Sequence, residues 1–213
     1  MTTRFTETLR DAAREDWEAT ISHRFVDELI AGTIAPEVMS CYLVQDHRFL
    51  DSFLMLLGAA QASADGFDAR LRFARFGGMI SGEENTYFER SFEALGVTRQ
   101  EREDAPDTAP TAGFKAIMRE AAETRSYAVA LSVLCVAEWS YLEWALKAKG
   151  SYPRSFVHAE WITLHDNDAF RDFVAFLRSE LDRVGPAEEG AARDVFTRAV
   201  KLERAFFDAA YRP

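Results

Sequence analysis

Apolar residues recur along this chain at the spacing of an α-helix. Positions three and four residues apart carry aliphatic or aromatic side chains over long stretches, whereas alternating runs of β-branched residues are absent. The six prolines fall between these periodic stretches and separate one from the next. The pattern predicts an all-α protein of seven or eight helices. The expected helices cover residues 3–31, 36–63, 67–94, 109–122, 125–148, 154–163 and 166–184, with a last one that ends near Tyr211.

Glycine and proline mark where several of these helices begin and end. Gly32 follows the first helix, Pro36 suits the first turn of the second, and Gly96 supplies a C-cap for the third. The polar, proline-containing stretch that starts at Val97 is expected to be a connection with one short helix. No connection is long enough to separate two folding units, and no internal repeat is present. Residues 1–213 are therefore expected to form one domain.

Three of the predicted helices carry a single carboxylate in the middle of an otherwise apolar face. These carboxylates are Asp46, Glu138 and Glu203. The apolar neighbours are Met39, Tyr42, Leu43, Phe49, Leu50, Phe53 and Leu54 for Asp46, Leu131, Leu134, Cys135, Tyr141, Leu142 and Ala145 for Glu138, and Phe196, Ala199, Val200, Phe206, Phe207 and Ala210 for Glu203. An ionised carboxylate is unfavourable in apolar surroundings unless it is paired or hydrogen-bonded.

Selection for folding alone would place Leu or Ala at these three positions, so we expect the carboxylates to converge on one pocket. Burial and mutual repulsion would raise some of their pKa values and provide a proton donor and acceptor near neutral pH. The alternative is that each one lies at the edge of the core and pairs with a neighbouring Lys or Arg. Glu84, which follows an aromatic stretch of the third helix, is interpreted as such a structural residue.

Composition and charge limit the classes of function. Hydrophobic residues make up 48% of the chain and charged residues 28%, which is typical of a globular protein. The formal net charge of −10 argues against non-specific binding to nucleic acid. Cys41 and Cys135 form no CxxC pair, so neither a cysteine metal site nor a structural disulfide is expected.

Two further expectations concern the membrane and the compartment. No apolar run is expected to reach the roughly 20 residues needed to span a bilayer, so no membrane partner is expected. The N-terminal residues are charged from the start and lack the apolar core of a signal peptide. The protein is therefore expected to be cytoplasmic.

Four segments of the chain resemble the thiaminase II-like (TenA) family in their order and spacing. They are residues 41–53, which resemble the family's YLxQDxxYLxxF pattern, and residues 137–145, 160–165 and 201–211. The resemblance covers essentially the whole chain. It implies a heme-oxygenase-like helical bundle, a homo-oligomer that is a tetramer or a dimer, and a pocket that binds an aminopyrimidine between aromatic rings.

The resemblance also implies roles for individual residues. Asp46 matches the aspartate that hydrogen-bonds the amino group and ring nitrogen of the pyrimidine, and Glu203 matches the catalytic glutamate near the C-terminus. The family's pocket aromatics and hydrogen-bonding side chains fall at Phe49, Phe114, Tyr141, His165 and Phe206. No cofactor is implied.

One departure from the family pattern concerns its nucleophilic cysteine. The family's cysteine position is occupied here by Ala137, and Cys135 projects in another direction. The chain therefore resembles the branch that lacks the cysteine, with Glu138 as a second catalytic glutamate. That branch is associated with hydrolysis of 4-amino-5-aminomethyl-2-methylpyrimidine or its N-formyl derivative to the hydroxymethylpyrimidine, in thiamin salvage.

Two alternatives remain at this point. The first is a metal-dependent oxygenase on the same bundle, although none of the four histidines forms the Glu-x-x-His pair that helical di-iron sites use. No metal site is expected for that reason. The second is a pyrimidine-binding or regulatory protein that retains the pocket without catalysis.

Overall fold

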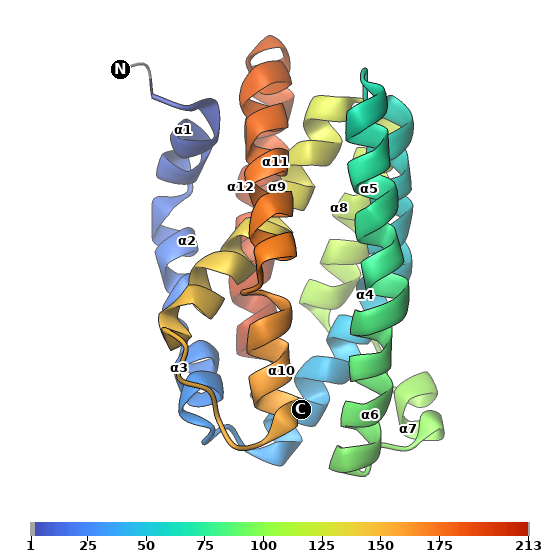
Figure 1. Cartoon of the computed structure of the whole chain (residues 1–213), viewed down its shortest axis with the longest axis vertical. Helices are drawn as coiled ribbons and strands as arrows, with labels where there is room; N and C mark the ends of the chain where they lie inside the picture. Colours follow the sequence, from blue (N-terminus) through green and yellow to red (C-terminus); the bar gives the residue numbers. More distant parts are fainter. Residues whose placement is uncertain (1–2, 213) are drawn as a thin grey trace.

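The chain folds into a bundle of twelve α-helical segments, and residues 3–212 contain no β-strand (Figure 1). The computed structural model describes residues 3–212. The α-helices are α1 Phe5–Ala12, α2 Arg14–Ile21, α3 Arg24–Ala31, α4 Pro36–Ser63, α5 Phe67–Met79, α6 Asn85–Leu95, α7 Arg99–Asp104, α8 Ala109–Thr124, α9 Tyr127–Ala145, α10 Phe156–Leu164, α11 Asp168–Val184 and α12 Glu189–Ala209. Three short helical turns of other types are η1 Ile80–Glu84, η2 Leu146–Ala148 and η3 Gly185–Glu188. The all-α prediction is confirmed.

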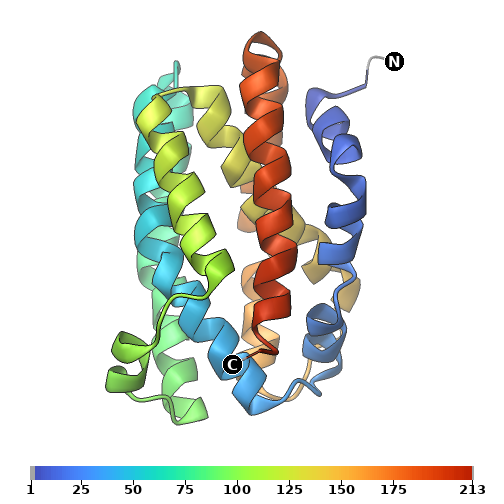
Figure 2. The ribbon, with the colours of Figure 1, turned by 180° about the vertical axis from the view of Figure 1, so that it is seen from behind.

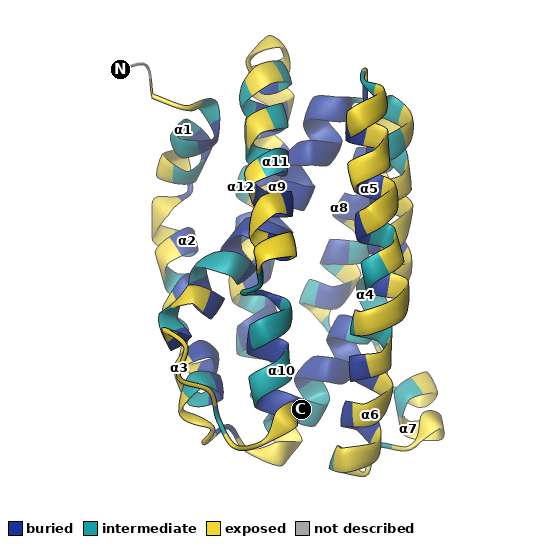
Figure 3. Ribbon diagram, in the orientation of Figure 1, coloured by how far each residue is buried: buried dark blue, intermediate teal, exposed yellow. Residues whose placement is uncertain are grey.

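Helix α9 forms the centre of the bundle. It packs against α4, α8, α11 and α12, and nearly all of its residues are buried (Figure 3). Ser126 starts the helix by accepting a hydrogen bond from the backbone N–H of Val129 at 3.1 Å. The other long helices therefore surround one very apolar helix.

By length and composition alone, the segment Tyr127–Ala148 could also cross a membrane. The expectation that no apolar run is long enough was therefore wrong for this segment. However, 83% of its most apolar window is buried inside the bundle. The hydropathy of this segment follows from its place at the centre of the core.

The first predicted helix, over residues 3–31, is divided into α1, α2 and α3, which form a column along one side of the bundle (Figure 2). Ala13 leaves helical geometry with φ −109° and ψ 19°. At the second break, His23 accepts a hydrogen bond from the backbone N–H of Phe25 through Nδ1, at 3.1 Å, and so caps α3. The breaks let the chain bend along the side of the bundle. Gly32 ends α3 with φ 69°, as predicted.

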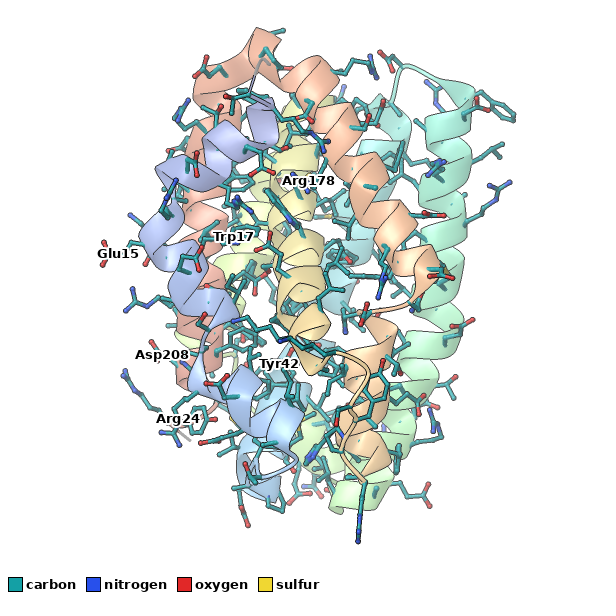
Figure 4. All side chains as sticks on the ribbon, turned by 60° about the vertical axis from the view of Figure 1, so that its left-hand side comes forward. Glu15, Trp17, Arg24, Tyr42, Arg178 and Asp208 are labelled. Carbon is teal, nitrogen blue, oxygen red and sulfur yellow. The ribbon has the colours of Figure 1, made fainter. Side chains whose placement is uncertain are left out.

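Helix α2 closes the bundle on this side through Trp17. Figure 4 shows Trp17 directed inward and Glu15 directed to solvent. The Trp17 ring stacks on Phe196 at a centroid distance of 5.9 Å, and its Nε1 donates to a carboxylate oxygen of Glu143 at 2.8 Å. Because α2 contacts both α9 and α12, it holds in place two of the helices that carry the predicted carboxylates.

The third predicted helix runs over nearly its expected length but is not α-helical throughout. Helices α5 and α6 continue into each other through the π-helical turn η1, which ends at Glu84. Gly96 ends α6 with φ 71°, as predicted. The expected short helix after Val97 is α7, which begins with a capping box formed by Thr98 and Glu101. A π-helical turn inside a long helix is often found at a functional site.

Candidate active site

Four carboxylates from four separate helical segments line one pocket. Asp46 comes from α4, Glu84 from the end of η1, Glu138 from α9 and Glu203 from α12. The remaining lining residues are Phe49, Leu50, Phe53, Ala137, Tyr141, Trp161 and His165. The space inside the pocket, about 390 Å³, includes a part that is open to solvent. The convergence of Asp46, Glu138 and Glu203 agrees with the prediction from the apolar faces.

The three predicted carboxylates are almost completely removed from solvent. Asp46 is 2% exposed, Glu138 8% and Glu203 4%. The Oδ1 atom of Asp46 is buried and has no hydrogen-bond partner. None of the residues that line the pocket is a Lys or an Arg. The alternative that these carboxylates pair with basic neighbours at the edge of the core therefore does not hold.

Burial is the main cause of strongly raised pKa values at these three residues. The pKa of Asp46 lies well above the usual range because of burial, with a further increase from the charge of Glu84 and a partial decrease from a hydrogen bond with Tyr141. The pKa of Glu138 is raised by burial, then by Glu84 and Asp46. That of Glu203 is raised by burial, then by Asp46 and Glu138. The pocket can therefore hold protonated carboxyl groups near neutral pH.

The interpretation of Glu84 as a structural residue at the edge of the core was wrong. Its carboxyl lines the pocket, and burial raises its pKa to about 7 without an opposing cation or hydrogen bond. The residue keeps part of its surface exposed, unlike the other three acids. The signal in the sequence was a carboxylate beside aromatic residues, but the π-helical turn removes Glu84 from the α-helical spacing that marked the other three acids.

His165 and Tyr141 both line the pocket, as the resemblance implies. The Nδ1 atom of His165 lies 2.8 Å from the backbone carbonyl oxygen of Trp161, so Nδ1 carries the proton and Nε2 is left as an acceptor. Burial lowers the pKa of His165 to about 4, with a small opposing effect of that hydrogen bond, and the ring is therefore neutral at pH 7. The Tyr141 hydroxyl lies 2.7 Å from the Tyr42 hydroxyl, which is buried deep in the bundle (Figure 4).

The predicted aromatic residues occupy two layers. Phe49 lines the pocket, whereas Phe114 and Phe206 do not. The ring centroid of Phe114 lies 5.9 Å from that of Phe49, and the centroid of Phe206 lies 6.1 Å from that of Phe114. The three rings therefore form one cluster behind the pocket wall. Trp161 lines the pocket and was not predicted as a site residue. It belongs to the family-like segment 160–165, which could have indicated it.

The two cysteine-related positions differ in their access to the pocket. Ala137 lines it, and Cys135 does not. Cys135 is completely buried, which raises the pKa of its thiol. Cys135 therefore has neither the position nor the thiolate character of a nucleophile facing the pocket. Within residues 3–212, no three His, Cys, Asp or Glu side chains are grouped so that they could hold a metal ion.

Comparison with known proteins identifies the family. The sequence profile of the TENA/THI-4/PQQC family matches residues 10–213. The aminopyrimidine aminohydrolase of Halalkalibacterium halodurans is 24% identical over 97% of this chain and 95% of its own length. The aminopyrimidine aminohydrolase of Bacillus subtilis is 26% identical over 98% of this chain and 90% of its own length.

A solved structure supports the same assignment at the level of the fold. The TenA homologue from P. horikoshii OT3 superposes with a TM-score of 0.87, covers 99% of both chains and is 22% identical. The predicted heme-oxygenase-like helical fold is thereby confirmed. From the match over residues 10–213 and this shared fold, the chain belongs to the TENA/THI-4/PQQC family.

Proposed function

We propose that this protein is an aminopyrimidine aminohydrolase of thiamin salvage. It hydrolyses the exocyclic C–N bond of 4-amino-5-aminomethyl-2-methylpyrimidine, or of its N-formyl derivative, to the hydroxymethylpyrimidine. The observation that carries the proposal is a buried pocket with four carboxylates, aromatic walls and no basic side chain other than a neutral His165. The names of the two bacterial relatives support the same reaction class.

Asp46 binds the edge of the pyrimidine ring in this proposal. A 4-aminopyrimidine presents an N–H donor beside a ring-nitrogen acceptor, and a carboxyl group can accept from the first and donate to the second. The raised pKa of Asp46 favours the protonated form that this pairing needs, and its Oδ1 has no other partner. Phe49, Tyr141 and Trp161 present apolar surfaces to a flat ring.

Glu138 and Glu203 carry out the proton transfers. One carboxyl contacts the leaving nitrogen while the exocyclic C–N bond breaks: it gives a proton to the neutral nitrogen of the N-formyl substrate, whereas the nitrogen of an ammonium substrate already carries the proton with which it leaves. The other carboxyl accepts the proton of the water whose oxygen bonds to the methylene carbon. Ammonia leaves from the aminomethyl substrate, and formamide leaves from the N-formyl substrate. Because Ala137 supplies no thiol, the attack on the methylene is made by water directly or by a carboxylate through an ester that water then hydrolyses.

A substrate panel followed by mass spectrometry tests the proposal. Thiamin, the aminomethylpyrimidine and its N-formyl derivative are each incubated with the protein, and the hydroxymethylpyrimidine is quantified. Product from the aminomethyl or N-formyl compound supports the proposal. Thermal stabilisation by these compounds without any product would show a binding protein instead. Metal analysis of the same preparation addresses the oxygenase alternative.

Asp46→Ala is expected to impair binding more than the chemical step. The methyl group can neither donate nor accept, so the ring edge loses its hydrogen bonds to Asp46 in a buried site, each of which is worth about 1–3 kcal/mol. We expect KM to rise about 10- to 100-fold and kcat to change less than KM. Steady-state kinetics over a range of substrate concentrations measures both constants. An unchanged KM with a large loss of kcat would instead place Asp46 in the proton transfers.

A further inference from the structure

Glu84 has no role in the proposed proton transfers, yet it shares the pocket with the three acids that do the binding and the chemistry. Charged or polar neighbours on the same helix are engaged elsewhere. Asn85 contacts His47 at 3.4 Å, and Arg90 forms a salt bridge with Glu160. No hydrogen bond or salt bridge within residues 3–212 reaches the Glu84 carboxyl, and burial raises its pKa to about 7.

Glu84 is the most accessible of the four acids that line the pocket. It is partly exposed, whereas Asp46, Glu138 and Glu203 are buried, and the preceding residue Glu83 is exposed. We call the side of the pocket at Glu84 its mouth. The charge of Glu84 acts on Asp46 and Glu138 but is not among the causes that raise the pKa of Glu203. The charge of Glu84 therefore influences Asp46 and Glu138 more strongly than Glu203.

The electrostatic character of the pocket favours a cation. Among its four acids, Glu84 has the least strongly raised pKa, about 7, and can carry a negative charge near neutral pH, whereas its single basic ring, His165, is neutral at pH 7. A ligand that brings one positive charge to the mouth supplies the partner that Glu84 lacks. Hydrogen bonds between ionised groups are stronger than those between neutral groups, especially where water is excluded.

We propose that Glu84 binds the primary ammonium group of the substrate at the mouth of the pocket and thereby makes the site selective for cationic aminomethyl heterocycles. This inference rests on the proposed function, because it places the ring at Asp46 and the aminomethyl group within reach of Glu84, Glu138 and Glu203. The N-formyl derivative and the hydroxymethyl product are neutral at that position and lack this interaction. Glu84 is thus a specificity-determining residue, and release of the neutral product is favoured.

Calorimetric titration of two ligands tests the inference. The aminomethylpyrimidine is the cationic ligand, and the hydroxymethylpyrimidine is the neutral one. Titrations are made in the Glu203→Gln background so that the first ligand is not consumed. We expect the cation to bind at least about tenfold more tightly than the neutral ligand. Glu84→Gln should reduce this ratio of affinities by about tenfold or more, since a hydrogen bond to a charged group contributes about 1.5–3 kcal/mol. The affinity for the neutral ligand should change less than about threefold.

Two further variants complete the test. Glu83→Gln removes an exposed carboxylate from the same π-helical turn and should leave both affinities unchanged. Glu84→Asp keeps the charge on a shorter side chain and should retain part of the preference. The inference is overturned if the Glu203→Gln protein binds the two ligands with equal affinity, or if the added Glu84→Gln change weakens the binding of both ligands in the same proportion. If it reduces the ratio while the substrate panel yields no product, the hydrolase proposal fails and the ammonium site stands.

Discussion

Replacing Glu203 by Gln is expected to lower kcat for the aminomethylpyrimidine by about 10³-fold. Proton transfer by a positioned side chain contributes about 10²–10⁴-fold to a rate, and the amide of Gln can neither donate an acidic proton nor accept one. Gln has nearly the same shape, and Glu203 has no cationic partner in the pocket that the substitution would leave unpaired. The fold should therefore be retained. Initial rates measured by mass spectrometry of the product give the loss.

Glu189 provides a matched control for this variant. It lies in the first turn of the same helix, α12, where it is exposed and pairs with Arg193 at 2.6 Å. Such surface pairs contribute little to stability, so Glu189→Gln should change neither kcat nor the melting temperature appreciably. A Glu203→Gln protein that is folded and turns over within about threefold of the unmodified rate would remove Glu203 from the mechanism.

The architecture was predictable because local signals and packing agree over most of the chain. Ser126 caps α9, Asn167 caps α11 by accepting from the backbone N–H of Phe170, and Gly96 ends α6 with a positive φ. At each of these points the residue type that the sequence offers is the one that the backbone geometry requires. The helix limits there lie within a few residues of the predicted ones.

The division of the first helix was not predictable from the same signals. Neither Ala13 nor the residues at 22–23 are typical helix breakers, and the apolar periodicity continues across both points. The breaks have a tertiary cause, since Trp17 must reach α9 and α12 while α3 packs at the other end of the bundle. Local propensity carries no information about such a bend.

Placement of the site residues shows a similar limit. A helical pattern assigns Asp46, Glu138 and Glu203 to inward faces, and three inward carboxylates leave few arrangements other than a shared pocket. The pattern does not show how far an inward side chain lies from the pocket. It therefore could not show that Phe114 and Phe206 pack behind Phe49. Nor could it assign Glu84, because the π-helical turn departs from the α-helical spacing on which the pattern depends.

Glu138→Gln is expected to lower the activity of the protein and to raise its stability at alkaline pH. As one of the two proton-transfer groups, Glu138 should contribute about 10²–10³-fold to kcat. As an acid whose pKa burial raises well above its usual value, it should also destabilise the fold once it ionises. The variant is therefore expected to be nearly inactive and, at alkaline pH, more stable than the unmodified protein by about 1–3 kcal/mol.

The sign of the pH dependence follows from linkage. Between the ordinary pKa of Glu, about 4.5, and the raised pKa of folded Glu138, the folded state binds more protons than the unfolded state, so stability falls as pH rises through this window. Gln removes this contribution. The melting temperature of the variant should therefore match that of the unmodified protein near pH 4.5 and exceed it increasingly towards pH 8, as thermal unfolding at a series of pH values would measure.

The exposed residue Glu123, on α8, offers the control, since Glu123→Gln should shift neither the pH profile nor the rate. A Glu138→Gln protein that is inactive and less stable at every pH would show that the carboxylate is satisfied by contacts in the folded state. In that case it would serve packing rather than proton transfer. A variant that is more stable but inactive would show that the unpaired Glu138 carboxyl destabilises the fold and is needed for catalysis. Such a trade-off between stability and activity is expected of a catalytic residue.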